Sequence, residues 1–392
     1  MLRAVDDVDG QGIYIRKLCD ALFEMDATNQ YVAFYNDAGQ AGRYRDRRNV
    51  REVVVAGRKK LLWDQVQVPL AARREHLDVL FHHKFSIPLL PPCPVVVQQR
   101  GTEYWSHPDF YVGAAGRMDL LYNRAMIPLY CRRATRVLTN SDTLGDELVR
   151  HAGVPRSKLR TVYAAADESF RPITDAATLT QVQKRYALPA TPFLLMVVKG
   201  HQVLGQASGK ALTPRKNVEV VLEAYGRMRR DAGGPGTAAP PLVILGLGIA
   251  ERLSPAVIAE QVDPATVFIP GFVEFGDMPA IYTMARALVF PSRYESFGLP
   301  IVEAMACGCP VITSTTSACP EVAGGAAILV DPDDVAGMAA AMQRVSFDDA
   351  LVEELRGRGI RRAASFSWAD SARTLLSELQ TAARAGTGAR AR

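Results

Sequence analysis

Two carboxylates, Glu295 and Glu303, lie eight positions apart in the segment PSRYESFGLPIVEAMACGCPVITS, which begins at Pro291. Apolar, β-branched runs stand before and at the end of this segment, which predicts a strand, a loop, a helix and a second strand. Pro300 suits the first turn of the helix and Gly308 suits its end. The loop and the helix N-terminus are therefore expected at the carboxyl end of a strand, where open α/β sheets bind ligands.

The main-chain N–H groups of Phe297, Gly298 and Leu299 are expected to point into that crevice, where a helix N-terminus favours phosphate. Gly298 lets a ligand approach the backbone closely. Eight helical residues separate the two Glu backbones by about 12 Å, whereas the carboxyl pair of a glycosidase lies about 5 to 9.5 Å apart. Carboxylates also accept hydrogen bonds from paired hydroxyls. We therefore expect Glu303 and Glu295 to hold two diols, one on a ribose and one on a sugar, with phosphates between them.

The run from Glu295 to Glu303, followed by AMACGCPVI, resembles the E-x7-E motif of family 4 glycosyltransferases, or glycosyl transferases group 1. Further matches are PRKN from Pro214, PGFV from Pro270, MPAIYTMARALVFPS from Met278 and PEVAGGAAILVDP from Pro320. The resemblance implies the GT-B fold, in which two Rossmann-like doubly wound α/β domains face each other across a cleft. It also implies a retaining transfer of a hexose from a nucleotide-diphosphate sugar to an acceptor hydroxyl, in polysaccharide or glycolipid assembly.

The same resemblance assigns roles to single residues. Glu303 is expected to hold the nucleotide ribose and Glu295 to lie near the donor sugar hydroxyls, with the amides of residues 297–299 on sugar and diphosphate. Lys216 is expected to neutralise the diphosphate leaving group, with Arg215 as a weaker candidate. A preorganised cation stabilises the negative charge that builds on a leaving oxygen. Base recognition is expected at the backbone near Gly271 and Val273.

Two departures from the family pattern concern the first half of the chain. The family begins with a strand that runs into a Gly-rich loop, whereas DGQG, which ends at Gly12, follows only eight residues here. The first strand is therefore expected to be truncated, and Gly12 to be held less well near the diphosphate. Arg100 stands where many relatives have a His near the donor sugar. Because Arg cannot accept a proton, we expect it to bind phosphate or an anionic acceptor, with His82, His83 and His107 as weaker substitutes for the missing His.

Two further departures flank the second half. The segment 200–213, GHQVLGQASGKALT, is longer than the family's connection and predicts a mobile loop over the diphosphate site. Lys199 or Lys210 is expected to help close it. Ala164 and Ala165 replace the usual Asn-Gly before Asp167, which bears on hinge flexibility.

Metal-dependent glycosyltransferases of the other main fold use a D-x-D pattern, which occurs here at Asp7 to Asp9 and at Asp331 to Asp333. Asp331 follows a predicted strand in a Pro turn, which favours a loop or cap role. No metal and no cofactor are therefore expected. The six cysteines are scattered, which favours buried free thiols over a zinc site.

Twelve short apolar runs alternate with stretches of helical period, which is typical of parallel sheets covered by helices. The expected organisation, in chain order, is an N-terminal acceptor-side domain at 1–166, a linker at 167–175, a C-terminal nucleotide-sugar-binding domain at 176–365, a helix at 366–382 that crosses back to the N-terminal domain, and a flexible tail at 383–392.

The chain has 392 residues and a formal net charge of +5, which is too mild to indicate nucleic acid as a partner. The basic cluster between Arg43 and Lys60 is a candidate for peripheral contact with an anionic membrane, and a solvated loop is the alternative. No apolar run is long enough for a membrane span and no signal peptide is recognised, so a cytoplasmic location is expected, including the inner face of the plasma membrane. Two other functions stay open: a nucleotide-sugar-binding protein without transfer activity and a nucleotide-sugar epimerase on the same fold.

Overall fold

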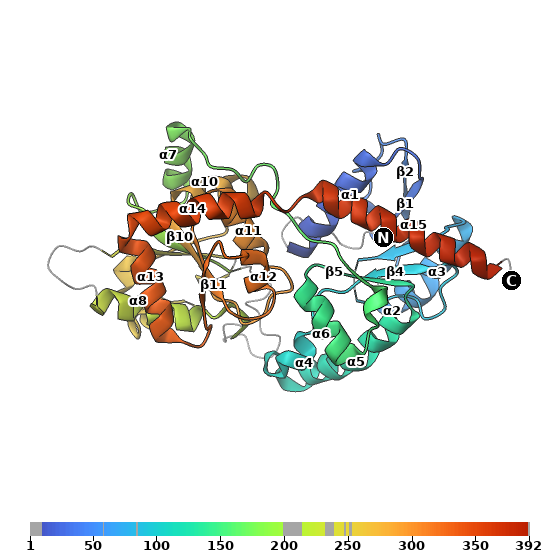
Figure 1. The fold of residues 1–392 in the computed structure, drawn as a ribbon, viewed down its shortest axis with the longest axis horizontal. Helices are drawn as coiled ribbons and strands as arrows, with labels where there is room; N and C mark the ends of the chain where they lie inside the picture. Colours follow the sequence, from blue (N-terminus) through green and yellow to red (C-terminus); the bar gives the residue numbers. More distant parts are fainter. Residues whose placement is uncertain are drawn as a thin grey trace. The chain divides into compact units, whose positions relative to one another are not determined.

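A computed structural model describes residues 10–57, 59–83, 85–198, 214–231, 239–246, 248–250 and 253–390 (Figure 1). These residues form two compact units. The first unit contains the described residues up to Pro108, Met118–Ala164, and the chain from Ser367 onward; the second contains Asp109–Arg117 and Ala165–Phe366. The first strand predicted ahead of Gly12 and the long segment 200–213 lie outside the described residues.

The first unit holds two parallel sheets. Strands β1 (Tyr31–Tyr35) and β2 (Val50–Val54) form one pair. The second sheet has the order β3 (Leu80–His82), β4 (Val95–Gln98), β5 (Arg136–Thr139) and β6 (Leu159–Thr161). Every residue of β4 is buried, as expected for an inner strand of a parallel sheet that is covered on both faces.

Helices cover these strands. In chain order they begin with α1 (Gly10–Met25), the short turn Ala38–Gln40 and a continuous helical segment made of α2 (Lys60–Leu62), a π-helical turn (Trp63–Gln67) and α3 (Val68–Arg74). They continue with α4 (Glu103–Ser106), the turn Pro108–Phe110, α5 (Gly113–Arg133), α6 (Asp142–Ala152) and the turn Arg156–Lys158. Of these, most of the turn Pro108–Phe110 and the start of α5 fall in the stretch Asp109–Arg117 that belongs to the second unit. Helix α6 shows why such elements begin and end where they do. Ser141 Oγ accepts a hydrogen bond from Leu144 N at its start, and Gly153 takes the left-handed conformation at its end.

A cavity of about 430 Å³ lies within the first unit, beside strands β1 and β3. Residues of helix α1 and of the C-terminal helix complete its lining, among them Cys19, Leu22, Leu376 and Leu379. Among the described residues, the β1–β2 pair and the four-stranded sheet are separate sheets, and the cavity lies beside β1 of the first and β3 of the second.

The second unit contains a six-stranded parallel sheet. Its strands are β7 (Phe193–Val197), β8 (Leu242–Leu245), β9 (Val267–Gly271), β10 (Ala285–Phe290), β11 (Val311–Ser314) and β12 (Ile328–Val330). Their order in the sheet is β12-β11-β10-β7-β8-β9. The chain builds outward from β7 in one direction and then returns to build outward from β10 in the other. The point between β7 and β10, at the carboxyl ends of the strands, is where such sheets bind nucleotides.

The helical elements of the second unit are α7 (Ala176–Arg185), the turn Pro214–Lys216, α8 (Val218–Asp231), α9 (Pro255–Ala259), the turns Pro264–Thr266 and Phe275–Asp277, α10 (Met278–Met284), α11 (Leu299–Ala306), α12 (Cys319–Ala323), α13 (Val335–Phe347) and α14 (Asp349–Ala363). Helices α8 and α13 pack against each other (Figure 1). Their apolar side chains, including Leu222, Tyr225 and Met342, join those of β7 and β8 in one buried core.

Helix α15 (Trp368–Arg390) returns to the first unit and packs along α1 (Figure 1). Its Trp368 ring meets the Tyr14 ring edge-on at 5.5 Å, and Ser371 Oγ donates to the Tyr163 carbonyl at 2.7 Å. The helix runs past residue 382, where its end was predicted, into the segment predicted to be a flexible tail. Ala382 is fully buried, so packing on the first unit continues to that point.

All six cysteines are free and buried, as the scattered spacing indicated. Cys19, Cys93 and Cys131 belong to the first unit, and Cys307, Cys309 and Cys319 belong to the second. Burial raises the pKa of the Cys19 and Cys309 thiols to about 12. These thiols therefore act as small apolar side chains of the two cores.

Candidate functional site

The turn Pro214–Lys216 and the loop after β10 are joined by hydrogen bonds at the point where the strand order reverses. Arg293 N donates to the Arg215 carbonyl at 3.0 Å, and Arg215 Nε donates to the Tyr294 carbonyl at 2.9 Å. The first of these bonds is between main-chain atoms, so it holds the two segments together whatever their side chains. The two basic residues of the turn are thereby placed beside the loop that carries Glu295.

Glu295 forms an ion pair with Lys216, whose Nζ donates to its Oε1 atom. Arg215 Nη2 lies 3.8 Å from the other carboxylate oxygen. The side chains of Glu295 and Lys216 are only 11% and 7% exposed. Burial by itself raises the pKa of the Glu295 carboxyl, but the charges of Lys216 and Arg215 outweigh it, so its pKa is lowered.

Aromatic rings surround the two cations. Lys216 Nζ lies 4.7 Å from the centroid of the Phe290 ring, and the Arg215 guanidinium lies 5.5 Å from that of Tyr294. Asn217 follows with a left-handed φ of 61°, and its side-chain amide donates to the Pro291 and Pro332 carbonyls. The basic turn is thus held by aromatic contacts and by hydrogen bonds to two loops, which fixes its position before any ligand arrives.

Helix α11 begins directly after Gly298, which has a φ of 99°. Its Pro300 occupies the first turn, and its buried Glu303 accepts a hydrogen bond from the Tyr282 hydroxyl at 3.2 Å. Burial and the Glu303 charge raise the pKa of Tyr282, so that tyrosine remains a neutral donor. Tyr282 therefore orients the carboxylate that was predicted to bind ribose.

The remaining predicted donor-site residues lie at the same edge of the sheet. Leu299 is the first residue of α11, and the Phe297 ring packs edge-on against Phe366 at 5.4 Å. Gly271 ends β9 with a φ of 83°, its carbonyl accepts a hydrogen bond from Gly246 N, and Val273 follows two residues later. Strands β10, β7, β8 and β9 are neighbours in that order, so their carboxyl ends form one continuous edge.

The predicted residues of the first half, Gly12 and Arg100, belong to the first unit. Gly12 lies in the first turn of α1. Arg100 is buried; its Nε donates to the His83 carbonyl at 2.8 Å and its guanidinium lies 5.0 Å from the Tyr14 ring. His82 and His83 are both buried, and His107 is half-buried. Burial lowers the pKa of His82 to about 3, so it is neutral at physiological pH.

The D-x-D patterns have ordinary turn contacts where they are described. Asp331 Oδ1 accepts a hydrogen bond from Asp333 N at 2.9 Å, and Asp333 pairs with Arg293 at 2.6 Å. This is a local side-chain turn, which is the loop role that the sequence favoured. Asp7 and Asp9 lie outside the described residues.

Three contributors to this site were not predicted. They are Tyr282, which bonds Glu303, Phe290, which faces Lys216, and Ser317, whose Oγ accepts from Glu295 N at 2.9 Å. Tyr282 and Phe290 both lie in the matched segment from Met278, but no pattern in that segment marks a side-chain role. Ser317 has a left-handed φ of 51° that the sequence does not signal.

Two family descriptions match the chain: "Glycosyltransferase Family 4" over residues 8–170 and "Glycosyl transferases group 1" over residues 206–348. Together these matches cover most of the chain, one in each half. The protein therefore belongs to the family 4, group 1 glycosyltransferases, and its two Rossmann-like units are those of the GT-B fold.

Among curated proteins, the O-antigen chain mannosyltransferase B of Escherichia coli is 31% identical over 236 residues, which is 60% of this chain and 58% of that protein. The serotype-specific mannosyltransferase WbdA of Escherichia coli is 28% identical over 243 residues, which is 61% of this chain and 28% of that protein. The matched region thus spans less than two thirds of either relative. Among solved structures, Anabaena HepE in complex with UDP and glucose aligns with a TM-score of 0.68 at 15% identity, covering 95% of this chain and 96% of that one. This last likeness shows the fold.

Among the helices that the structure describes, none combines the length and the apolar character that crossing a bilayer requires.

Proposed function

We propose that this protein is a retaining, metal-independent hexosyltransferase that uses a nucleotide-diphosphate sugar. One observation carries the proposal: at the point of strand reversal, Lys216 of the turn before α8 forms an ion pair with Glu295 of the loop that leads into α11. A diphosphate bound there meets a buried cation on one side and the N-terminus of a helix on the other.

In the proposed complex, Glu303 accepts hydrogen bonds from the ribose hydroxyls and the amides of residues 297–299 contact the sugar and diphosphate. Gly298 leaves the backbone open to close approach. The backbone from Gly271 to Val273 lies three strands from β10 on the same edge, which suits the base at the far end of the nucleotide. Lys216 and Arg215 stabilise the charge that develops on the departing diphosphate, so the chain's own cations supply what a metal supplies elsewhere.

The contacts of Glu295 favour same-face attack over a covalent intermediate. Its carboxylate is buried and engaged by Lys216, with Arg215 close by, and a carboxylate in that state is a poor nucleophile. We propose that Glu295 holds Lys216 in place and accepts a hydrogen bond from a hydroxyl of the donor sugar. The departing phosphate takes the proton from the hydroxyl of the acceptor substrate. Retention then follows without an enzyme nucleophile.

The acceptor is proposed to be a carbohydrate or a lipid-linked saccharide bound by the first unit, where Gly12 and Arg100 lie. The buried Arg100 guanidinium suits a phosphate or another anionic group on that acceptor. Since both Escherichia coli relatives are mannosyltransferases, mannose donors are the first to test, with polysaccharide assembly as the setting. A cytoplasmic location with peripheral contact to an anionic membrane completes the proposal.

The test is incubation of the purified chain with radiolabelled UDP-, GDP- and dTDP-hexoses, with and without saccharide acceptors. We expect one of the donors to release its nucleotide. The glycoside product is expected to keep the anomeric configuration of the donor, and activity is expected to be unchanged in EDTA. Tight donor binding without release from any donor would instead indicate a nucleotide-sugar-binding protein. An epimerised nucleotide sugar formed without acceptor would indicate an epimerase.

A further inference from the structure

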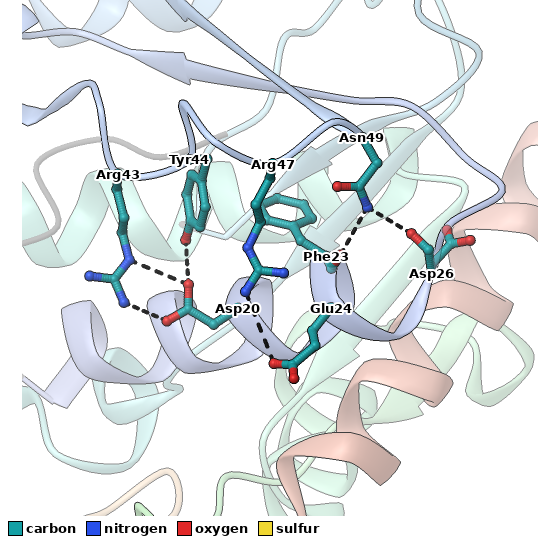
Figure 2. A network of polar contacts seen from close by, with 8 residues as sticks. All are labelled: Asp20, Phe23, Glu24, Asp26, Arg43, Tyr44, Arg47 and Asn49. Carbon is teal, nitrogen blue, oxygen red and sulfur yellow. Dashed lines mark hydrogen bonds and ion pairs between the residues drawn. The ribbon is translucent and has the colours of Figure 1, made fainter.

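Part of the positive charge of the basic segment between Arg43 and Lys60, the candidate for membrane contact, has partners inside the first unit. Arg43 pairs with Asp20 of helix α1 at 2.6 Å, and Tyr44 donates to the same carboxylate at 2.9 Å (Figure 2). Two further ion pairs bind this segment to its own unit, Arg47 with Glu24 and Arg51 with Glu75. The loop therefore packs on α1, and part of its positive charge has local partners.

The helical segment from Lys60 to Arg74 buries apolar side chains, among them Trp63 and Val68, but it also exposes several. Four of its exposed side chains are aliphatic: Leu61, Leu62, Val66 and Leu70 are between 44% and 65% exposed. Its carboxylate points inward: Asp64 is 2% exposed and accepts a hydrogen bond from Ser86 Oγ at 2.7 Å. A helix on the surface of a soluble protein normally presents polar side chains to water and buries its apolar ones.

The loop beside this segment extends the apolar surface. Gln65 Nε2 donates to the Ile87 carbonyl at 2.9 Å and its Oε1 accepts from Leu89 N at 2.9 Å. The next residue, Leu90, is 80% exposed, the highest value among the large apolar side chains described. Arg133, in the last turn of α5, reaches the Leu89 carbonyl at 3.5 Å and brings a positive charge to the same place.

Positive charge surrounds this apolar surface. Lys59 at one end of the segment and Arg73 and Arg74 at the other are exposed. Within the described chain, no ion pair involves Arg73 or Arg74, and Asp64 is the only carboxylate from residue 59 to residue 74. Both ends of the segment are therefore basic. A second copy of the chain placed symmetrically against it would bring like charges together in either helix direction, whereas an anionic surface satisfies both ends.

We propose that this surface docks on a membrane leaflet that carries anionic headgroups. The docking face consists of Leu61, Leu62, Val66, Leu70 and Leu90, flanked by Lys59, Arg73, Arg74 and Arg133. Aliphatic side chains enter the boundary between headgroups and acyl chains, and the basic side chains remain among the phosphates, as in interfacial amphipathic helices. The proposal defines the membrane contact named above, and it holds whether or not the chain transfers sugar.

Sedimentation with vesicles tests it without any donor sugar. The full chain is mixed with sucrose-loaded vesicles of phosphatidylglycerol and phosphatidylcholine, or of phosphatidylcholine alone. We expect binding to the anionic vesicles that weakens as salt is raised. The triple variant Leu62→Gln/Val66→Gln/Leu70→Gln is expected to bind at least tenfold more weakly. Arg73→Gln/Arg74→Gln is expected to lose about fivefold for each charge removed.

Matched controls carry equal numbers of changes on the second unit. Val257→Gln/Phe347→Gln/Ile360→Gln removes three exposed apolar side chains, and Arg230→Gln/Arg361→Gln removes two exposed charges; both are expected to bind vesicles like the parent. Unchanged binding in both docking-face variants would overturn the proposal, and so would equal binding to neutral vesicles. The proposal would also be overturned if the parent chain did not bind vesicles and sedimentation equilibrium showed that the parent is a dimer and the triple variant a monomer. Circular dichroism melting checks that every variant is folded.

Discussion

The Lys216 ammonium and the Glu295 carboxylate form a buried ion pair between the turn before α8 and the loop after β10. The two residues are 79 positions apart in sequence, and the strand order brings them together. A buried charge that loses its closest partner is costly, because it has given up water without compensation. The pair therefore links the stability of the second unit to the proposed chemistry.

Replacing Lys216 with Met is expected to lower turnover about a hundredfold or more, because the leaving group loses a preorganised cation. The same change is expected to lower the free energy of unfolding by about 3–5 kcal/mol, since Glu295 is left buried with a weaker partner. The double variant Lys216→Met/Glu295→Gln is expected to recover much of the stability and none of the turnover. Urea unfolding and donor turnover measure the two effects. A double variant no more stable than the single one would contradict this account of the pair.

The same pair predicts an acid dependence of stability. The pKa of Glu295 is lowered in the fold from its usual value of 4.5, so the unfolded chain binds its proton first as pH falls. The stabilisation is present above about pH 4.5 and is lost as pH falls through the lower folded pKa. Unfolding free energies between pH 3 and pH 6 are expected to fall less steeply in Lys216→Met/Glu295→Gln than in the parent chain. If the unfolding free energies of the two proteins fell equally steeply with pH, Glu295 would not be the source of this acid dependence.

Changing Glu303 to Gln keeps the side-chain volume and removes the charge. We expect nucleotide affinity to fall by about 10- to 100-fold, the range for hydrogen bonds to a charged acceptor, when nucleoside diphosphates are titrated by calorimetry. Tyr282→Phe is the control: it removes the hydroxyl that orients Glu303 and leaves the carboxylate. It is expected to change affinity only a few-fold. If Glu303→Gln bound nucleotide as the parent does, ribose recognition would lie elsewhere.

Gly298→Ala tests the left-handed residue ahead of α11. Its φ of 99° disfavours any side chain, and an added Cβ would lie 3.0 Å from Ile301 Cδ1. We expect a loss of about 1–2 kcal/mol in unfolding free energy together with weaker donor binding. Gly276→Ala is the matched control, because a Cβ added at Gly276 would have no heavy atom within 4 Å outside its chain neighbours. Equal melting temperatures for the two variants would count against a strained cap.

His82 predicts a second pH effect, in the first unit. Its pKa of about 3 in the fold is far below the usual 6.5. Between these two pH values His82 is protonated in the unfolded chain and neutral in the folded chain. Stability is therefore expected to fall as pH drops below about 6.5, with a slope of about 1.4 kcal/mol per pH unit. His82→Gln is expected to remove that part of the slope. His76→Asn, at an exposed position with a left-handed φ of 51°, is expected to keep it. Unfolding curves from pH 4 to pH 7 decide between these outcomes.

Local patterns predicted much of the fold. Each of the twelve strands in the described part of the chain overlaps a predicted apolar run, because buried parallel strands are rich in β-branched residues on both faces. Strand β2 begins at Val50, whereas its continuous apolar run begins only at Val53, since Arg51 and Glu52 interrupt the apolar pattern. Helix α11 has Pro300 and Gly308 where they were expected, because start and stop signals act over a few residues.

Contacts distant in sequence could not be predicted in the same way. The residues Lys216, Glu295 and Glu303 were predicted to form a nucleotide-sugar site from the family resemblance, but the Lys216–Glu295 ion pair and the hydrogen bond of Glu303 to Tyr282 depend on which strands are neighbours. The basic loop from Arg43 shows how contacts distant in sequence change the meaning of a local charge pattern. Its charges are close together in sequence, yet Asp20 and Glu24 of α1 compensate part of them.

The six buried thiols allow local unfolding of the chain to be measured by alkylation. A membrane-permeable alkylating reagent reaches a cysteine only when the surrounding core separates, so its rate of reaction reads out local unfolding. Three of these probes belong to each unit, Cys19, Cys93 and Cys131 in one and Cys307, Cys309 and Cys319 in the other. Mass spectrometry of labelled peptides can therefore follow each half separately, in the unmodified protein and even inside a cell.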